Sequence, residues 1–177
     1  MTTDEAITAV IAVFSLVISI LTAWLTLFRH GQVRMTRPTI VAFAFECPTQ
    51  KLFLRFLLYN TAQRGNIIES MHIVLVQGGK RLTYSFWGYG DSQASLVRGS
   101  GLFVSKEGIA FNHHFVRPKH EPVITLETGT CIIHVYTSVL GQSKDALLQT
   151  VPLEISEKEA TAINNPQAGL IYDWNPE

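Results

Sequence analysis

The feature that most constrains this chain is an uninterrupted apolar run near its N-terminus, from Ala6 to Phe28. The run contains no charged residue, no proline and no glycine. As a helix rising about 1.5 Å per residue it would be roughly 35 Å long, whereas a hydrocarbon core is roughly 30 Å thick. We therefore expect one transmembrane helix over residues 6–28, preceded by a short tip of residues 1–5.

The charges on either side of the run predict its orientation. Asp4 and Glu5 precede it without any Lys or Arg, so the basic region of a cleaved signal peptide is missing. Arg29, Arg34 and Arg37 follow it closely, and basic flanks favour the cytoplasmic side. We expect an uncleaved single-pass anchor with the N-terminus outside, a basic juxtamembrane linker over residues 29–38, and the remaining chain in the cytoplasm.

Small residues repeat along the apolar run at alternating intervals of four and three, which places them on one helical face. In lipid, such a face lets helix backbones approach closely, and its hydroxyls bond across the contact or back to their own carbonyls. The stripe predicts association with a second copy or with another membrane protein, although Ser and Thr are also ordinary members of transmembrane helices. Its members are Thr8, Ala12, Ser15, Ser19, Thr22 and Thr26.

From Thr39 onward the pattern changes to short runs of β-branched and aromatic residues separated by turn formers. Residues 52–76 resemble two strands and the polar corner of an immunoglobulin-like sandwich, without the Cys…Trp…Cys spacing of antibody domains. We expect a mainly β fold, an antiparallel β-sandwich of immunoglobulin-like architecture over residues 39–156. The expected strands begin at Thr39, Lys51, Ile67, Lys80, Gly101, Ile109, Glu121, Thr130 and Ala146.

Residues 157–177 are expected to form a short helix and a C-terminal tail. Ser156 and Glu159 have the spacing of a capping box at a helix start. Tyr172 and Trp174 are large enough that packing against the β-domain is favoured over full exposure. An exposed tail that serves as a ligand for a partner is the alternative.

Charge and cysteine content limit the classes of function. The chain has 14 Lys and Arg against 14 Asp and Glu, so it lacks the positive field that gathers nucleic acid, and no nucleic-acid partner is expected. Cys47 and Cys131 lie in strand-like stretches. Two buried free thiols would suit a reducing compartment, while one disulfide between them would suit an oxidising one.

Residues 99–116 resemble the histidine-bearing segment of chymotrypsin-fold serine proteases, in which a Gly-Ser-Gly run and a strand lead to Asn and His. That chemistry also requires a nucleophile, a buried carboxylate and an oxyanion hole. No serine after His114 is flanked by the glycines of an oxyanion turn. A serine protease is therefore not expected, and a hydrolase with an unrecognised site is kept only as an alternative.

The histidines of the same segment offer a candidate metal or small-ligand site. Adjacent strand residues point to opposite faces, so His113 and His114 are not expected to bind one ion together. His114, His120 and Glu121 could form a ligand set across the intervening turn, but the spacing is not that of a known zinc site. We expect structural histidines and no cofactor, with a ligand or metal sensor as the alternative.

The loop over residues 86–101 is rich in glycine and aromatic residues, a composition common at recognition surfaces. Its partner-binding candidates are Trp87, Tyr89, Asp91 and Arg98; the alternative is that Trp87 finishes a core strand. No phosphate-binding glycine motif is present. The function expected from the sequence is a non-enzymatic, membrane-anchored interaction module whose β-domain recognises a protein partner.

Overall fold

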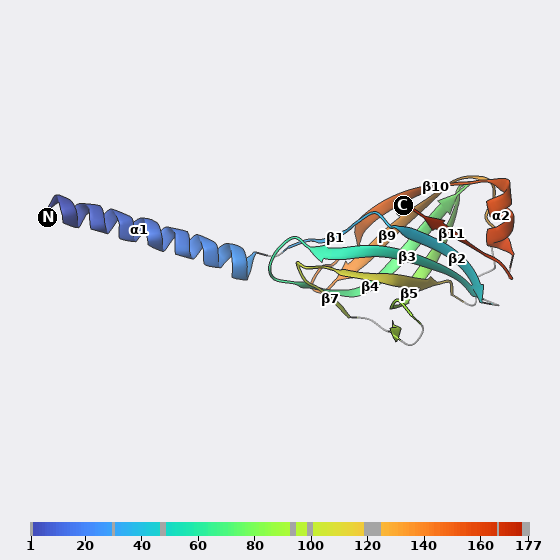
Figure 1. Cartoon of the computed structure of the whole chain (residues 1–177), viewed down its shortest axis with the longest axis horizontal. Helices are drawn as coiled ribbons and strands as arrows, with labels where there is room; N and C mark the ends of the chain where they lie inside the picture. The colour runs from blue at the N-terminus through green and yellow to red at the C-terminus, as the bar shows by residue number, and fades with distance from the viewer. Residues whose placement is uncertain are drawn as a thin grey trace.

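A computed structural model describes residues 2–29, 31–46, 49–92, 95–98, 101–118, 125–165 and 167–174. An N-terminal helix projects away from a single curled β-sheet (Figure 1). Strands account for 52% of the residues that the structure describes, so the expected mainly β class is confirmed.

The helix begins at Thr3, three residues before the apolar run. The Thr2 hydroxyl accepts a hydrogen bond from the backbone of Glu5, and the Glu5 carboxylate accepts one from the backbone of Thr2, which completes a capping box. Helix α1 (Thr3–Ala23) continues into a π-helical turn, η1 (Trp24–Phe28). None of its residues is buried, and its mean hydropathy reaches 2.5. By length and composition, this one helix is able to cross a membrane.

The sheet is antiparallel throughout and holds eleven strands in the part of the chain that the structure describes. Its main order is β10-β9-β4-β5-β8-β3-β2-β11, while β1 pairs with β3, β6 with β5 and β7 with β4. The strands are β1 (Val33–Met35), β2 (Ile40–Glu46), β3 (Thr49–Asn60), β4 (Asn66–Gln77), β5 (Lys80–Tyr89), β6 (Val97–Arg98), β7 (Leu102–Val104), β8 (Ile109–Val116), β9 (Gly129–Val139), β10 (Ala146–Ile155) and β11 (Gly169–Asp173).

The continuous sheet curls into a half-barrel, which is not clearly the immunoglobulin-like sandwich expected from the sequence. A sandwich divides its strands between two separate sheets, whereas here each long strand pairs with the next around the curl. Register shifts between β4 and β9, β5 and β8, and β9 and β10 add local twist to the strands. These irregularities help one sheet to bend around its own core.

The core lies on the inner side of the curl and follows the two-residue period of the strands. In β9, buried residues alternate with half-buried ones from Cys131 to Val139. The same alternation buries Leu52 and Leu54 in β3. Cys131 is a buried free thiol, and burial raises its pKa to about 12. Cys47, which a disulfide would require as the partner of Cys131, lies outside the described residues.

The C-terminal segment adds an element that the sequence did not predict. β11 pairs with β2, and the Trp174 backbone N–H donates to the Thr39 carbonyl over 2.8 Å. Tyr172 and Trp174 are half-buried against the core with their rings 6.1 Å apart, so the expected packing of the tail is confirmed. The short strand β1, within the segment expected to be a linker, was also not predicted.

Three further features are the predicted helix after Ser156, the strand expected from Glu121 and the edge strand β10. Helix α2 (Glu157–Asn164) begins with the predicted Ser156 and Glu159 capping box. Of the strand expected from Glu121, residues 125–127 are not extended strand and the rest lies outside the described residues. β10 forms one edge of the sheet and contains Pro152, which is tolerated there because an edge strand does not need every N–H for pairing.

Candidate binding cleft

An open cleft of about 730 Å³ lies on the outer face of the sheet and is lined by residues of β2, β3, β5 and β8 and of the segment that follows β5. This return segment, with described residues 90–92 and 95–98, folds back so that β6 pairs with the end of β5. The strand residues that line the cleft alternate along the chain with residues of the core. On β3, for example, Phe53 lines the cleft while its neighbours Leu52 and Leu54 are buried. The volume is typical of ligand-binding sites. The cleft is lined by Ile40, Ala42, Lys51, Phe53, Trp87, Gly90, Asp91, Ser92, Leu96, Arg98, Asn112 and His114.

Two glycines allow the returning segment to lie close to β5. Gly88 pairs with Arg98 of β6, and a Cβ atom on Gly88 would lie 2.6 Å from the Val97 carbonyl oxygen. Gly90 has a φ of 154°, and a Cβ atom there would lie 2.8 Å from the Ser95 carbonyl oxygen. Both positions need glycine because the backbone of the return segment occupies the space of a side chain.

A polar network fixes the start of the return segment to the sheet. The Gly90 N–H donates to the Asn112 carbonyl over 3.0 Å, and Arg55 Nη1 contacts Asp91 Oδ1 at 2.6 Å. Arg55 also donates to Asn112 Oδ1 over 3.3 Å. The Arg55 and Asp91 side chains are 37% and 48% exposed, so this ion pair contributes only about 0–1 kcal/mol. It ties Asp91, which lines the cleft, to β3.

Trp87 forms one wall of the cleft, and two cations lie close to its ring. The Arg98 guanidinium is 4.4 Å from the ring centroid, and Lys51 Nζ is 5.1 Å from it. Both distances are within the range of cation–π attraction. Phe86, the preceding residue, packs against the core, and the register shift between Phe86 and Gly88 lies at this point in the strand.

Tyr89 is the one loop candidate that the structure places elsewhere. Its ring packs against the core, 5.4 Å from Phe111 and 6.4 Å from Phe86. Trp87, Asp91 and Arg98 therefore meet in the cleft, whereas Tyr89 supports the sheet beneath it.

The adjacent histidines point to opposite faces, as their strand positions predict. His114 lines the cleft: its ring contacts Phe53 edge to face at 4.6 Å, and its Nε2 donates to the Gly90 carbonyl over 3.3 Å. Burial lowers the pKa of His114. His113 is fully buried and stacks on Phe56 at 4.0 Å; burial lowers its pKa to about 4.

The metal-ligand set considered from the sequence is only partly visible. His120 and Glu121 lie outside the described residues, so their position relative to His114 is not defined. Across the described ranges, no three His, Cys, Asp or Glu side chains gather as a metal site would require.

The small-residue stripe of α1 and η1 lies on the exposed surface of the helix. Every hydroxyl in it donates to a carbonyl of the preceding turn, with distances of 2.8 or 2.9 Å. These donors are thus satisfied inside the helix, as a lipid environment requires. The five donors are Thr8, Ser15, Ser19, Thr22 and Thr26, and Ala12 supplies the remaining small side chain.

The sequence analysis did not identify Lys51 and Phe53 of the cleft lining, or Arg55 beside them. Lys51, Phe53 and Arg55 alternate along β3, so their common face was predictable from the strand period. That Arg55 lies opposite Asn112 depends on the pairing of β3 with β8, which no local pattern specifies. Comparison of the sequence with models of known protein families finds no match. A search of curated proteins finds no significant similarity.

Proposed function

We propose that this protein is a non-enzymatic, membrane-anchored interaction module whose cleft binds a segment of a protein partner. The observation that carries the proposal is the cleft itself, in which Trp87, Arg98 and Asp91 lie together on the outer face of the sheet, away from the core. Trp and Arg are the side chains most enriched at the energetic centres of protein interfaces.

The form of the cleft favours a peptide-like segment. Ile40, Ala42 and Phe53 provide apolar contact area, and Trp87 adds a large ring that loses little conformational entropy on binding. Charged groups lie around this apolar surface, which is the usual arrangement of an interface with an apolar centre and a polar rim. A peptide segment could place an apolar side chain on the apolar surface of the cleft and its polar backbone groups beside the surrounding charges.

The hydrogen bonds around the cleft argue against a hydrolase. Ser92, Asp91 and His114 all line it, but each bonds to a different group within the described residues. Ser92 Oγ lies 2.9 Å from Ser95 Oγ, Asp91 pairs with Arg55, and His114 Nε2 donates to a backbone carbonyl. A hydrolase would instead couple serine to histidine and histidine to carboxylate.

The apolar helix supports attachment to a membrane, and the charges beside it support the orientation. Arg29 and Arg34 follow the helix, while Asp4 and Glu5 occupy its first turn. We propose that the β-domain is cytoplasmic, because basic residues favour that side. The small-residue stripe supports contact with a second copy or with another membrane protein.

The test is purification of the intact chain from membranes in mild detergent, followed by identification of the proteins that remain bound. Wild type and Tyr136→Ala, which removes a half-buried ring from β9, should retain the same partner. Trp87→Ala and Arg98→Ala should lose it, with an affinity loss of at least about 30-fold for a residue at the energetic centre of an interface. Equal retention by all four proteins would reject the cleft as the binding site.

The membrane part of the proposal needs its own measurement. The Ser15→Leu/Ser19→Leu/Thr22→Leu variant keeps the helix apolar but fills the small-residue face. If that face mediates association, the native mass of the detergent-solubilised complex should fall for this variant. An unchanged native mass would remove the stripe from the proposal.

A small-ligand sensor is the second candidate, and the volume of the cleft favours it. Native mass spectrometry of the purified protein would show a bound molecule in wild type that is lost in Trp87→Ala. A wild-type mass equal to that of the bare chain would exclude a tightly held ligand.

A further inference from the structure

Exposed apolar side chains gather at the end of the sheet where the helix joins. Ile67, Phe103 and Leu140 are 40%, 57% and 56% exposed. Ile67 of β4 lies opposite Phe103 of β7, and the Leu140 N–H donates to the Ile67 carbonyl over 2.9 Å. These three side chains therefore come from neighbouring positions in three separate segments.

This apolar cluster lies beside the point at which the helix enters the domain. The Asn66 side chain donates to the Gly31 carbonyl over 3.0 Å, and the Gln32 N–H donates to the Thr61 hydroxyl over 2.9 Å. The turn between β3 and β4 and the first residue of β4 are thus bonded to the residues that follow the helix. Only residues 29–32 separate η1 from β1, and even fully extended they span less than about 20 Å.

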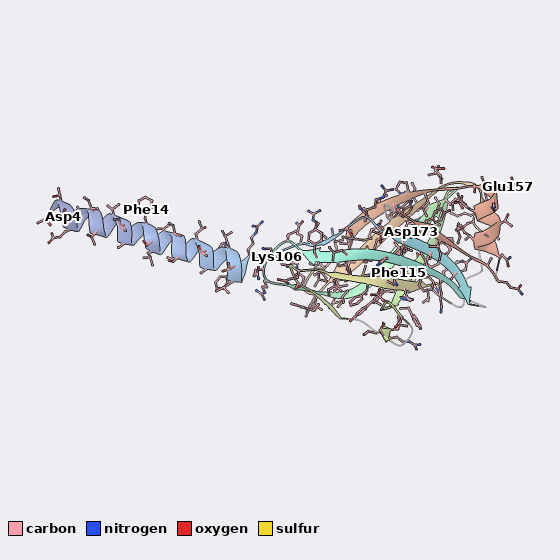
Figure 2. The ribbon with its side chains drawn as sticks, viewed as in Figure 1. Asp4, Phe14, Lys106, Phe115, Glu157 and Asp173 are labelled. Carbon is pink, nitrogen blue, oxygen red and sulfur yellow. The ribbon has the colours of Figure 1, made fainter. Side chains whose placement is uncertain are left out.

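The turns around the cluster carry exposed cations. Arg64 lies in the turn between β3 and β4, Lys106 between β7 and β8, and Lys144 between β9 and β10. Figure 2 shows Lys106 beside the end of the helix, far from Glu157 at the opposite end of the domain. Glu107 and Asp145 lie in the same described turns, so the cations outnumber the carboxylates there.

We propose that this end of the β-domain rests on an anionic lipid surface, with Ile67, Phe103 and Leu140 entering the headgroup region and Arg64, Lys106 and Lys144 facing the lipid phosphates. The proposal goes beyond partner binding by the cleft and depends on the membrane anchoring proposed above. The short connection holds this end close to the bilayer, and an anionic inner leaflet attracts basic side chains near its surface. Docking would fix the direction in which the cleft faces.

The experiment places a tryptophan at the proposed contact and measures its quenching by lipids. Phe103→Trp and the control Ile171→Trp are each reconstituted as the full chain in vesicles of phosphatidylcholine and phosphatidylserine with brominated acyl chains. Ile171 is 68% exposed and lies on β11, toward the opposite end of the domain (Figure 1). Emission from each variant is compared with that of wild type, whose tryptophans are Trp24 in the helix and Trp87 and Trp174 in the β-domain.

Phe103→Trp should show additional emission that bromine quenches, whereas the additional emission of Ile171→Trp should be unaffected. Arg64→Glu/Lys106→Glu in the Phe103→Trp background should reduce the quenching, while Arg81→Glu/Lys158→Glu, at the other end, should not. Equal quenching at positions 103 and 171 would overturn the proposal. Quenching of wild type that is lost in Trp24→Phe tests the anchor separately, so failure of docking is distinguishable from failure of insertion.

Discussion

Replacement of His113 by Phe should remove a specific pH dependence from the stability of the β-domain. His113 is fully buried, stacks on Phe56 and lies within 6.5 Å of the Phe86 and Tyr89 ring centroids. Burial lowers its pKa from 6.5 to about 4, with the nearby His114 as a smaller cause in the same direction. The folded protein therefore holds this imidazole neutral at pH values where the unfolded chain protonates it.

The magnitude follows from that difference in pKa. Between pH 6.5 and pH 4 the unfolded state binds more protons than the folded state, so stability falls as the pH falls. With the two pKa values of His113, the loss at pH 5 relative to pH 8 is about 2 kcal/mol, and its acid limit is about 3 kcal/mol. Phenylalanine retains the planar ring and cannot be protonated, so this contribution should disappear.

The assay is urea unfolding of the full chain in mild detergent at pH 8 and pH 5, followed by circular dichroism of the sheet. His113→Phe should lose about 2 kcal/mol less than wild type between these two pH values. His134→Phe is the control, because His134 is a half-buried residue of β9 that contacts the Thr150 hydroxyl at 3.0 Å. If His113→Phe shows the same pH dependence as wild type, the reasoning from burial is refuted.

Three further predictions concern single positions elsewhere in the β-domain. Gly90→Ala should destabilise the return segment by about 1–3 kcal/mol, because the backbone has a positive φ there and the added Cβ atom would meet the Ser95 carbonyl oxygen. Hydrogen exchange over residues 95–98 should become faster, and unchanged exchange would contradict this prediction. Ser156→Ala should cost about 1 kcal/mol by removing the cap of α2, measured as a lower midpoint of thermal unfolding, while Ser156→Asp should retain most of the stability. Cys131 should resist alkylation at pH 8 in the folded protein and react after unfolding, because burial keeps the pKa of its thiol near 12. Mass spectrometry of the peptide that contains Cys131 measures the modification, and rapid modification of the folded protein would show that the thiol is accessible.

The sequence predicted the elements whose signals are local. The apolar run, the alternation in β9 and the capping box at Ser156 each depend on residues close together in the chain, so their structures were predictable. β1 and β11 were not predicted because they are short and are held by pairing with β3 and β2, whose own patterns give no sign of these partners. The curl of the sheet likewise depends on strand order, which alternation alone does not specify.

The candidate site was predictable to a similar degree. Loop composition pointed to Trp87, Asp91 and Arg98, and the structure brings these three into one cleft. It also pointed to Tyr89, which instead packs against the core next to a register shift in β5. A bulge changes which face a side chain takes, and no residue pattern in this stretch identified it.

Pro152 has a consequence for a protein that is held at a surface. Tethering to a bilayer would confine all copies to two dimensions and give them one orientation, so their sheet edges would meet far more often than in solution. An open edge strand invites addition of another strand. Pro152 lies in the middle of β10, where it offers no N–H, so two facing copies cannot form an unbroken ladder there. Many tethered copies could therefore lie close together without pairing their β10 edges into one intermolecular sheet.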